Sequence, residues 1–579
     1  MKKHIIPTIN ILYKCFSVHI SKYILRFMLL IILASVSKIL NLIPPYINGN
    51  IIDFVLKKDF NKIVFLIIMS FIISLAMALL SLGQTYLANL LSNKSLAEVK
   101  GKIYHKILYL KMHEFDKKSV GEYISRIDGD TNSINNFYVN TIPNLFISII
   151  TLIVSGIFSF YISPLLSIVG IVNFPISIII FYFFGKKMKE SYSKVRNASD
   201  EYSSMMNQAL HSERTIKGLH IEESILSGIC GKLNNLCRYN IKNGMISAYG
   251  GLVQLLVSIV LELLLMAIAC YLIIEGVLSI GLYVAFNVYL SNFLSSLRTI
   301  ASTNLNIQTV LVSISRVDEI MDNNNEEVMG DSTEIISGDI EVSNLGFSFN
   351  PDYPLFKDLS IKFFAKEITA IVGLSGCGKT TLLNLIAKIY DYEKGSILID
   401  NRCINDLSLH DLRSSISYVQ QEPFIFNDTI KNNLFVANPD ATNEEIIDAC
   451  KKAHIFKTID DLPSGFDTVI GEHGYNFSGG QKQRLAIARG IIKKSKIFLL
   501  DEITSDLDGE TEKFLLRTLN NLSKTHTVLL VAHRLTTVMN IARIIVLHNG
   551  RIIEIGNHEQ LIAKCEIYRN LFDKAEVNE

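Results

Sequence analysis

Six long apolar stretches dominate the first half of the chain. They occupy residues 23–45, 63–86, 141–162, 165–184, 249–274 and 277–297. Each is close to the ~20 residues that span a bilayer as a helix. A buried helix of a soluble protein can imitate one such stretch, but six of them, bounded by turn residues such as Pro44 and Pro45, predict a membrane domain of six helices.

Two long basic connections, between the second and third stretches and between the fourth and fifth, predict the orientation of this domain. Lysine and arginine recur along both, whereas the connections at 163–164 and 275–276 are nearly absent. By the positive-inside bias the basic connections face the cytoplasm. A loop at 46–62 with both lysines and aspartates is a mild exception. Helical patterning, as in 198–210, indicates that the membrane helices continue into the cytoplasm.

The pattern changes after residue 321. Residues 322–337 are polar and lack apolar periodicity, which is typical of a linker. Short β-branched runs then alternate with helical patterns and predict an α/β domain around a largely parallel sheet. The expected strands are 368–372, 397–399, 416–419, 497–500, 528–531 and 544–547. We therefore expect a membrane domain at 1–321, a linker at 322–337 and an α/β domain at 338–579.

Composition agrees with a lipid-facing part fused to a water-facing part. Hydrophobic residues make up 49% of the 579 residues and charged residues 19%. A net charge of +1 gives no argument for nucleic acid, and we expect no such partner. The eight cysteines form no framework or metal-type cluster, so reduced thiols are expected. The first 22 residues lack a cleavage site and predict a cytoplasmic start, too short for an attached protease domain.

A glycine-rich loop follows the expected strand 368–372 and precedes a helix predicted at 382–389. This is the context of a phosphate-binding loop, in which backbone N–H groups and the helix N-terminus hold phosphates. Lys379 would bind the β- and γ-phosphates of ATP, and the Thr380 hydroxyl would bind Mg²⁺. The expected nucleotide-binding residues here are Gly373, Ser375, Gly376, Cys377, Gly378, Lys379, Thr380 and Thr381.

Two carboxylates end the apolar strand predicted at 497–500. A doubly wound sheet presents its ligands at such strand ends. Mg²⁺ prefers hard oxygen ligands, and hydrolysis needs a base beside the attacking water. We assign Asp501 to the metal and Glu502 to the base; the alternative is a solvated acidic strand end.

Between these two halves, the string FSGGQ at 477–481, followed by KQRLAIAR, closely resembles the signature sequence of ATP-binding cassette proteins. Further strings match the family in order. Gln421 resembles the lid-loop glutamine, which implies catalytic and metal-binding roles, and residues 505–508 resemble the loop after the catalytic carboxylate. His533 resembles the catalytic switch histidine, and Phe349 the aromatic residue that stacks on adenine.

The resemblance also implies a shared site, in which the signature of one ATPase domain completes the phosphate site of a second. The residues expected to do so are Ser478, Gly479, Gly480 and Gln481. Phe477 replaces the family's usual leucine and Phe349 its usual tyrosine, and both keep an apolar surface. Because the catalytic strings are intact, a homodimer and a pair with a different half-transporter both stay open.

The membrane half resembles exporter-type half-transporters, so the resemblance covers nearly the whole chain. Residues 115–126 and 213–218 resemble the segments in which the family places coupling helices, and 468–474 resembles the segment that receives one. The alternative for both loop segments is a solvated charged helix. A contiguous packed path is what coupling requires.

The cargo is not named by any pattern. Lys38, Gln254 and Glu262 are the costly residues within the apolar stretches, and Glu262 is a candidate contact for a cationic substrate or the partner of Lys38 in an ion pair. The resemblance implies ATP-driven export of an amphiphilic drug, peptide or lipid across the cytoplasmic membrane, with the N-terminus and the ATPase domain in the cytoplasm. Gating of a pathway, or import of a small chelate, is the alternative.

Overall fold

The computed structural model describes residues 21–323, 325–326, 335, 337–471, 474–503, 509–532 and 537–576. The chain divides into two compact units, which are described separately. The membrane unit comprises Met1–Lys106 and Val120–Asp322, and the ATPase unit comprises Ile107–Ser119 and Asn323–Glu579. A short segment within the first long basic connection thus packs with the ATPase unit.

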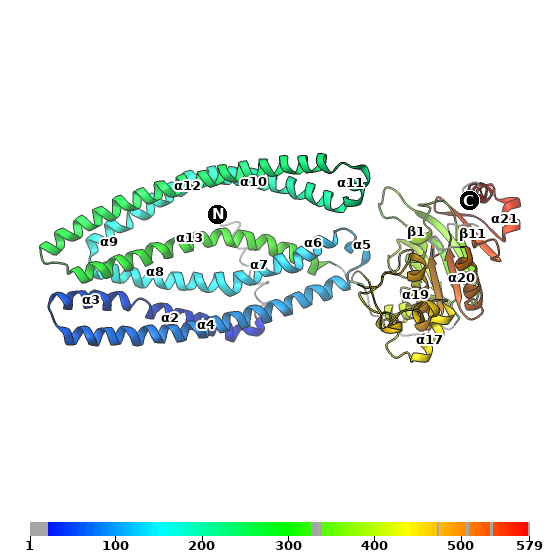
Figure 1. Cartoon of the computed structure of the whole chain (residues 1–579), viewed down its shortest axis with the longest axis horizontal. Coiled ribbons are helices and arrows are strands. Elements are labelled where there is room, and N and C mark those ends of the chain that lie inside the picture. Colours follow the sequence, from blue (N-terminus) through cyan, green and yellow to red (C-terminus); the bar gives the residue numbers. More distant parts are fainter. Residues whose placement is uncertain are drawn as a thin grey trace. The chain divides into compact units, whose positions relative to one another are not determined.

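Long helices build the membrane unit (Figure 1). Within the part of the chain that the structure describes, six helical segments are long and apolar enough to cross a membrane, which confirms the predicted six spans. The helices are α2 (Ile24–Leu40), α3 (Pro44–Leu56), α4 (Phe60–Leu108), α6 (Val120–Ser125), α7 (Thr131–Asn136), α8 (Ile142–Ile162), α9 (Pro164–Ile171), α10 (Asn173–His211), α11 (Glu213–Leu219), α12 (Glu222–Ile274) and α13 (Ile280–Asp322). As predicted, α4, α10 and α12 continue far into the basic connections.

The loop expected at 46–62 is mostly helix. Pro44 and Pro45 begin α3, because proline suits the first helical turn, and only residues 57–59 separate α3 from α4. The connection is therefore a tight turn. Lys57 and Lys58 lie in this turn, and Lys62 lies in the first turn of α4.

The start of the last span, at the N-terminus of α13, packs closely against α3. A Cβ atom at Gly281 would lie 1.9 Å from the carbonyl oxygen of Gly49, so only glycine fits there. Beside it, the Asp53 carboxylate accepts hydrogen bonds from the Ser279 hydroxyl at 2.5 Å and the Gly281 N–H at 2.9 Å. Asp53 thus caps the start of α13, where a negative charge is favoured.

Within the described residues, the ATPase unit holds two main sheets and a small antiparallel pair of β7 and β8. The larger has the order β12-β11-β3-β10-β9-β6 and is parallel apart from β12; the smaller is antiparallel, with the order β2-β1-β4-β5. The strands are β1 (Ile340–Phe347), β2 (Phe356–Phe363), β3 (Ile368–Val372), β4 (Lys394–Ile399), β5 (Arg402–Cys403), β6 (Ile416–Val419), β7 (Asp428–Thr429), β8 (Val469–Ile470), β9 (Ile497–Asp501), β10 (Thr527–Val531), β11 (Arg543–His548) and β12 (Arg551–Gly556).

The expected strand at 397–399 lies in β4 and therefore in the antiparallel sheet, not in the parallel one. Its partners β1 and β5, and the strand β2 on the other side of β1, were not predicted. β2 alternates buried and exposed residues, which is typical of an antiparallel sheet with one face in the core. That alternation at Leu359, Ile361 and Phe363 is a signal that the sequence contained.

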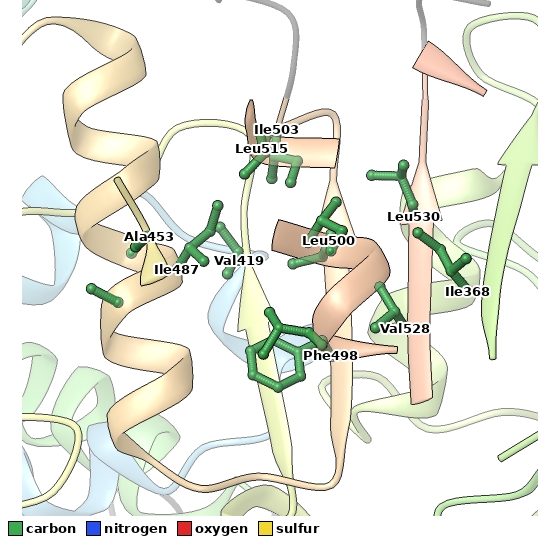
Figure 2. Packing of buried hydrophobic residues seen from close by; sticks show 14 of the residues in the cluster. Ile368, Val419, Ala453, Ile487, Phe498, Leu500, Ile503, Leu515, Val528 and Leu530 are labelled. Atoms are coloured by element: carbon green, nitrogen blue, oxygen red, sulfur yellow. The ribbon is translucent and has the colours of Figure 1, made fainter. Parts of the chain in front are cut away.

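Both faces of the parallel sheet are buried. Phe498 and Leu500 of β9 point into one core, beside Ile487, as Figure 2 shows, while Ile497 and Leu499 point into the other. The helices of this unit are α5 (Met112–Phe115), α14 (Lys379–Ile386), α15 (Leu409–Ser414), α16 (Ile430–Phe435), α17 (Asn443–Lys452), α18 (Phe456–Asp460), α19 (Gly479–Ile492), α20 (Gly509–Leu522), α21 (His558–Lys564) and α22 (Glu566–Glu576). Packing in the two cores keeps the strands aligned. The candidate functional residues lie at the carboxyl ends of these strands.

Candidate ATP-binding site

The loop between β3 and α14 has the geometry of an anion cradle. Gly376 and Gly378 have φ values of +79° and +106°, which side chains other than glycine rarely adopt. A Cβ atom at Gly378 would lie 2.7 Å from the ring of Phe356, whereas at Gly376 it would meet nothing within 4 Å. Packing therefore requires Gly378, while Gly376 turns the backbone and leaves open space beside it.

Lys379 begins α14, so this helix starts three residues before its predicted start. The side chain is only 5% exposed, and its ammonium donates hydrogen bonds to the carbonyl oxygens of Gly373 at 2.9 Å and Leu374 at 3.1 Å. The loop therefore curls around the ammonium group. A phosphate placed in this loop would meet one positive charge and the N-terminal N–H groups of α14.

Cys377 differs from Ser375 and Thr380 because its side chain points into the core. Its thiol is buried, and burial raises its pKa. Of the Cys377 groups, only the backbone N–H is suited to a phosphate contact. The exposed Ser375 and Thr380 and the half-buried Thr381 lie on the same loop and helix start.

The carboxylate of Asp501 meets the loop at the carboxyl end of β9. It is 4% exposed and accepts a hydrogen bond from the Thr380 hydroxyl at 3.0 Å and one from the Tyr418 hydroxyl at 3.5 Å. Burial raises the pKa of Asp501, and the charge of Glu502 adds to the increase. A cation beside Asp501 and Thr380 would offset this burial, and their hard oxygens fit Mg²⁺.

Glu502 follows Asp501 on a sharp turn. Its φ is +50°, and its backbone N–H donates to the carbonyl oxygen of Val531 at 3.0 Å. This turn ends β9 and leaves the side chain half-buried beyond the strand. His533 and the segment 504–508 lie outside the described residues.

Gln421 reaches the same edge of the sheet from β6. Val419 pairs with Leu500 of β9, so Gln421 lies just beyond the strand end that also carries Asp501. Its carbonyl oxygen accepts a hydrogen bond from Gln483 at 3.4 Å. Gln421, Phe477 and Gly479 line one cavity of about 820 Å³, which joins the lid-loop residue to the signature segment.

The signature segment forms the N-terminus of α19. The Ser478 hydroxyl oxygen accepts from the Gln481 N–H at 3.3 Å, and the Gln481 side-chain oxygen accepts from the Ser478 N–H at 2.9 Å, a reciprocal capping box. The Gln481 side chain is thereby engaged with its own helix, which the S-x-x-Q pattern could have predicted. The Ser478 O–H keeps its proton to donate.

The substitution of phenylalanine at 477 is explained by burial. Phe477 is 4% exposed, belongs to the core under the parallel sheet and contacts Tyr475 edge to face at 5.7 Å. Gly480 is also buried, whereas Ser478 and Gly479 are exposed. Phe477 therefore anchors this segment in the core, and Ser478 and Gly479 remain accessible at the surface.

Phe349 is the expected adenine-stacking residue and is 51% exposed. Its ring packs edge to face on Phe347 at 4.8 Å and on Tyr390 at 5.4 Å. Tyr390 was not predicted. Its hydroxyl donates to the Asp116 carboxylate at 2.6 Å, and burial raises its pKa to about 12.

Asp116 belongs to the short segment Ile107–Ser119 that packs with the ATPase unit. Lys111 forms an ion pair with Asp391 at 2.8 Å, and the Glu326 N–H donates to the Tyr109 carbonyl oxygen at 2.8 Å. The short helix is α5, which ends at Phe115, where the predicted coupling segment 115–126 begins. The predicted segment also contains α6, and the other predicted segment, 213–218, lies within α11; the coupling role of both segments stays a prediction.

Within the membrane unit the ion pair between Lys38 and Glu262, one of the two alternatives for these residues, does not form. Among the described residues, neither Lys38 nor Glu262 has a salt-bridge partner, and Glu262 is exposed. Gln254 instead donates to the Ser177 hydroxyl at 2.9 Å and links α12 to α10.

A phosphate-binding loop, paired strand-end carboxylates and a capped signature helix define an ATPase of the ATP-binding cassette class. Residues 27–297 match the family described as ABC transporter transmembrane region, and residues 356–505 match that described as ABC transporter. Proteins provisionally named multidrug export ATP-binding/permease protein, from Staphylococcus aureus strains NCTC 8325, COL and N315, are each 32% identical over 491 residues, 84% of this chain and 85% of the relative. The chain belongs to the ABC transporter family. It is an exporter-type half-transporter, a multi-pass membrane protein whose ATPase drives export.

Proposed function

We propose that two copies of this chain export an amphiphilic substrate across the cytoplasmic membrane, with ATP held between their ATPase units. The observation that carries this proposal is a phosphate cradle, built from Lys379 and Gly376 and joined to Asp501 through Thr380, on a chain with six spans. The exporter relatives support the direction of transport. The basic connections support a cytoplasmic ATPase unit.

Each residue of the site has a role in this proposal. Phe349 stacks on adenine, and Lys379 with the N–H groups of 376–381 holds the phosphates. Thr380, Asp501 and Gln421 would hold Mg²⁺, which supplies positive charge to the phosphates when bound. Glu502 accepts the proton of the attacking water, and His533 completes the catalytic group.

The second copy contributes the signature. α19 flanks β6, since the Ser417 hydroxyl donates to the Gly490 carbonyl oxygen at 3.2 Å. β6 is three strands from β3 in the sheet, and neighbouring strands lie about 4.8 Å apart, so β6 is roughly 14 Å from the strand that carries the phosphate loop. The exposed Ser478 hydroxyl and the first N–H groups of α19 therefore suit a phosphate brought by another chain.

Glu502→Gln tests the proposal directly. We expect the variant, reconstituted in nanodiscs, to bind ATP but to lose on the order of 100-fold or more of its turnover, because the amide cannot accept the proton. Glu554→Gln, at an exposed carboxylate of β12, is the matched control. Near-normal hydrolysis by Glu502→Gln would contradict the assignment of Glu502 as the base. If the wild-type protein did not hydrolyse ATP, the proposed function would be wrong.

A further inference from the structure

A cavity of about 500 Å³ lies between α10 and α13, inside the membrane unit. Its volume is that of sites for drug-sized molecules, roughly 300–1,000 Å³. Phe174, Ile178 and Leu294 give it apolar walls. Arg298 is the one charged residue among the described residues that line it.

The polar and apolar linings lie at different depths. At 1.5 Å per residue, Leu294 is roughly 21 Å and Arg298 roughly 27 Å along α13 from its start at Ile280, in a hydrocarbon layer of ~30 Å. Thr299 and Ser302 also line the cavity near Arg298. The cavity therefore has a charged end close to where α13 leaves the bilayer and, deeper inside, an uncharged end with apolar walls.

Polar groups at the deep end already hydrogen bond with one another. The Ser177 hydroxyl donates to the Asn173 carbonyl oxygen at 2.7 Å and accepts from Gln254 at 2.9 Å. These groups carry no charge and leave the deep end without a need for an ionic ligand. The apolar neighbours Phe174 and Ile178 then favour a hydrocarbon chain there.

Arg298 differs from these groups because its charge is not compensated. Among the described residues it has neither a hydrogen-bond acceptor nor a carboxylate partner. A bare guanidinium at the margin of the hydrocarbon is costly, and its planar donors match phosphate or carboxylate oxygens. The cavity thus carries a positive charge, which disfavours a cationic drug. Glu262, the candidate contact for a cationic substrate, does not line it.

We propose that this cavity binds the cargo, and that the cargo is an amphiphile with an anionic phosphate or carboxylate head and an apolar tail. The head contacts Arg298, with Thr299 and Ser302 beside it, and the tail lies along Phe174, Ile178 and Leu294. This inference rests on the proposed function, because it names the substrate class of the same transporter.

The test compares three amphiphiles of equal chain length on the full-length protein in phosphatidylcholine vesicles. The probes are dodecyl phosphate, dodecylphosphocholine and dodecyltrimethylammonium, below their micellar concentrations. Binding to nucleotide-free protein, the half-maximal concentration for changing ATP hydrolysis, and ATP-dependent movement of labelled dodecyl phosphate are measured. Binding without nucleotide tests the cavity even if hydrolysis fails, so the two proposals can fail separately.

We expect dodecyl phosphate to bind at least tenfold more tightly than dodecyltrimethylammonium and to be moved when ATP is present. Arg298→Gln should weaken dodecyl phosphate binding about tenfold or more and leave binding of the cationic probe within twofold, because a hydrogen bond between charged groups is lost. Arg298→Lys should restore most of the affinity. Arg196→Gln, at an exposed arginine of α10 outside the cavity, should match the wild type.

Three results would overturn the inference. Equal binding of the anionic and cationic probes would remove the charge preference. If Arg298→Gln kept the preference for the anionic probe, that preference would not arise from this cavity. Tight binding of dodecyl phosphate without ATP-dependent movement would make Arg298 an anchor for a resident lipid head rather than a cargo contact.

Discussion

The loop in which Lys379 is proposed to bind phosphate also holds its side chain in place. Its two hydrogen bonds to loop carbonyl oxygens keep the ammonium inside the curve of the backbone, so the charge is in place before a nucleotide arrives. A long side chain normally loses rotamer entropy when it is ordered, by up to ~2 kcal/mol. In this loop that entropy is already lost on folding and need not be lost again on binding.

Lys379→Ala should therefore weaken ATP binding about tenfold or more, because it removes charge-assisted hydrogen bonds of roughly 1.5–3 kcal/mol and the contacts that shape the loop. Titration with a fluorescent ATP analogue measures the change. Lys457→Ala, at an exposed lysine of α18, should bind as the wild type does. Equal affinity in the two variants would contradict the phosphate assignment.

Single residues also show what the sequence could and could not predict. That Lys379, Thr380 and Asp501 lie close to the strand ends was predictable, because a local string and a strand context specify their positions; their roles in binding ATP and Mg²⁺ stay predictions. Tyr390 was not, because its partners Phe349 and Asp116 are 41 and 274 residues away in sequence and meet it only in the folded chain. The side-chain role of Gln481 was overlooked, although its spacing from Ser478 was visible.

At the scale of elements, α5 and its flanking residues form a docking segment on the ATPase unit. Tyr390 connects this segment to the aromatic residue expected to stack on adenine, through one hydrogen bond to Asp116 and one ring contact to Phe349. The hydrogen bond between Tyr390 and Asp116 is thus one polar contact of this docking whose contribution should be measurable.

Tyr390→Phe keeps the ring and removes the hydroxyl, so it should loosen the docking segment by the ~1.5 kcal/mol of a hydrogen bond to a charged group. We expect hydrogen exchange of the amides of 107–119 to accelerate roughly tenfold. Asp116→Asn should have a similar effect, and the double variant should add little to either, since both remove one interaction. Tyr353→Phe, at an exposed ring, is the control, and additive effects would refute the direct contact.

Among the glycines of the membrane unit, Gly281 leaves the least room for a side chain, because α3 and α13 cross there. Gly281→Ala would force a methyl group onto the Gly49 carbonyl oxygen, and such overpacking costs about 1–3 kcal/mol. The unfolding temperature in nanodiscs should fall accordingly. Gly83→Ala on α4 meets nothing within 4 Å and should leave that temperature unchanged or raise it, because alanine favours the helix.

Elements were predictable where one period dominated. The six spans and the fully buried β3, β9 and β10 are predominantly apolar runs, which are visible in the order of residues along the chain. The placement of β4 was wrong because a short apolar run looks the same in a parallel and an antiparallel sheet, and only its pairing with β1 decides.

At the scale of the whole molecule, the proposed sharing of sites between two copies predicts complementation. A Lys379→Ala copy paired with a Ser478→Asp copy would leave one composite site intact, because the intact loop of the second copy faces the intact signature of the first. Aspartate still caps α19 but carries a negative charge toward the phosphate. Mixed dimers should therefore regain hydrolysis that neither homodimer has.

The reciprocal arrangement supplies the control. When both substitutions lie on one chain paired with a wild-type chain, each composite site contains one defect, and hydrolysis should be lost. If each chain instead used its own signature, the first pair would be inactive and the second would keep one working site. ATPase activity of purified, differently tagged pairs separates these outcomes.

The local capping of α19 has a consequence for how fast two copies can engage. Because Ser478 and Gln481 complete the helix end within a single chain, the surface that we propose to receive a phosphate from a second copy is already ordered in isolation. Little conformational entropy then remains to be lost at encounter, and the main cost is that of immobilising one body against another. Within one bilayer, where both copies are held at the same depth and tilt, even that cost shrinks.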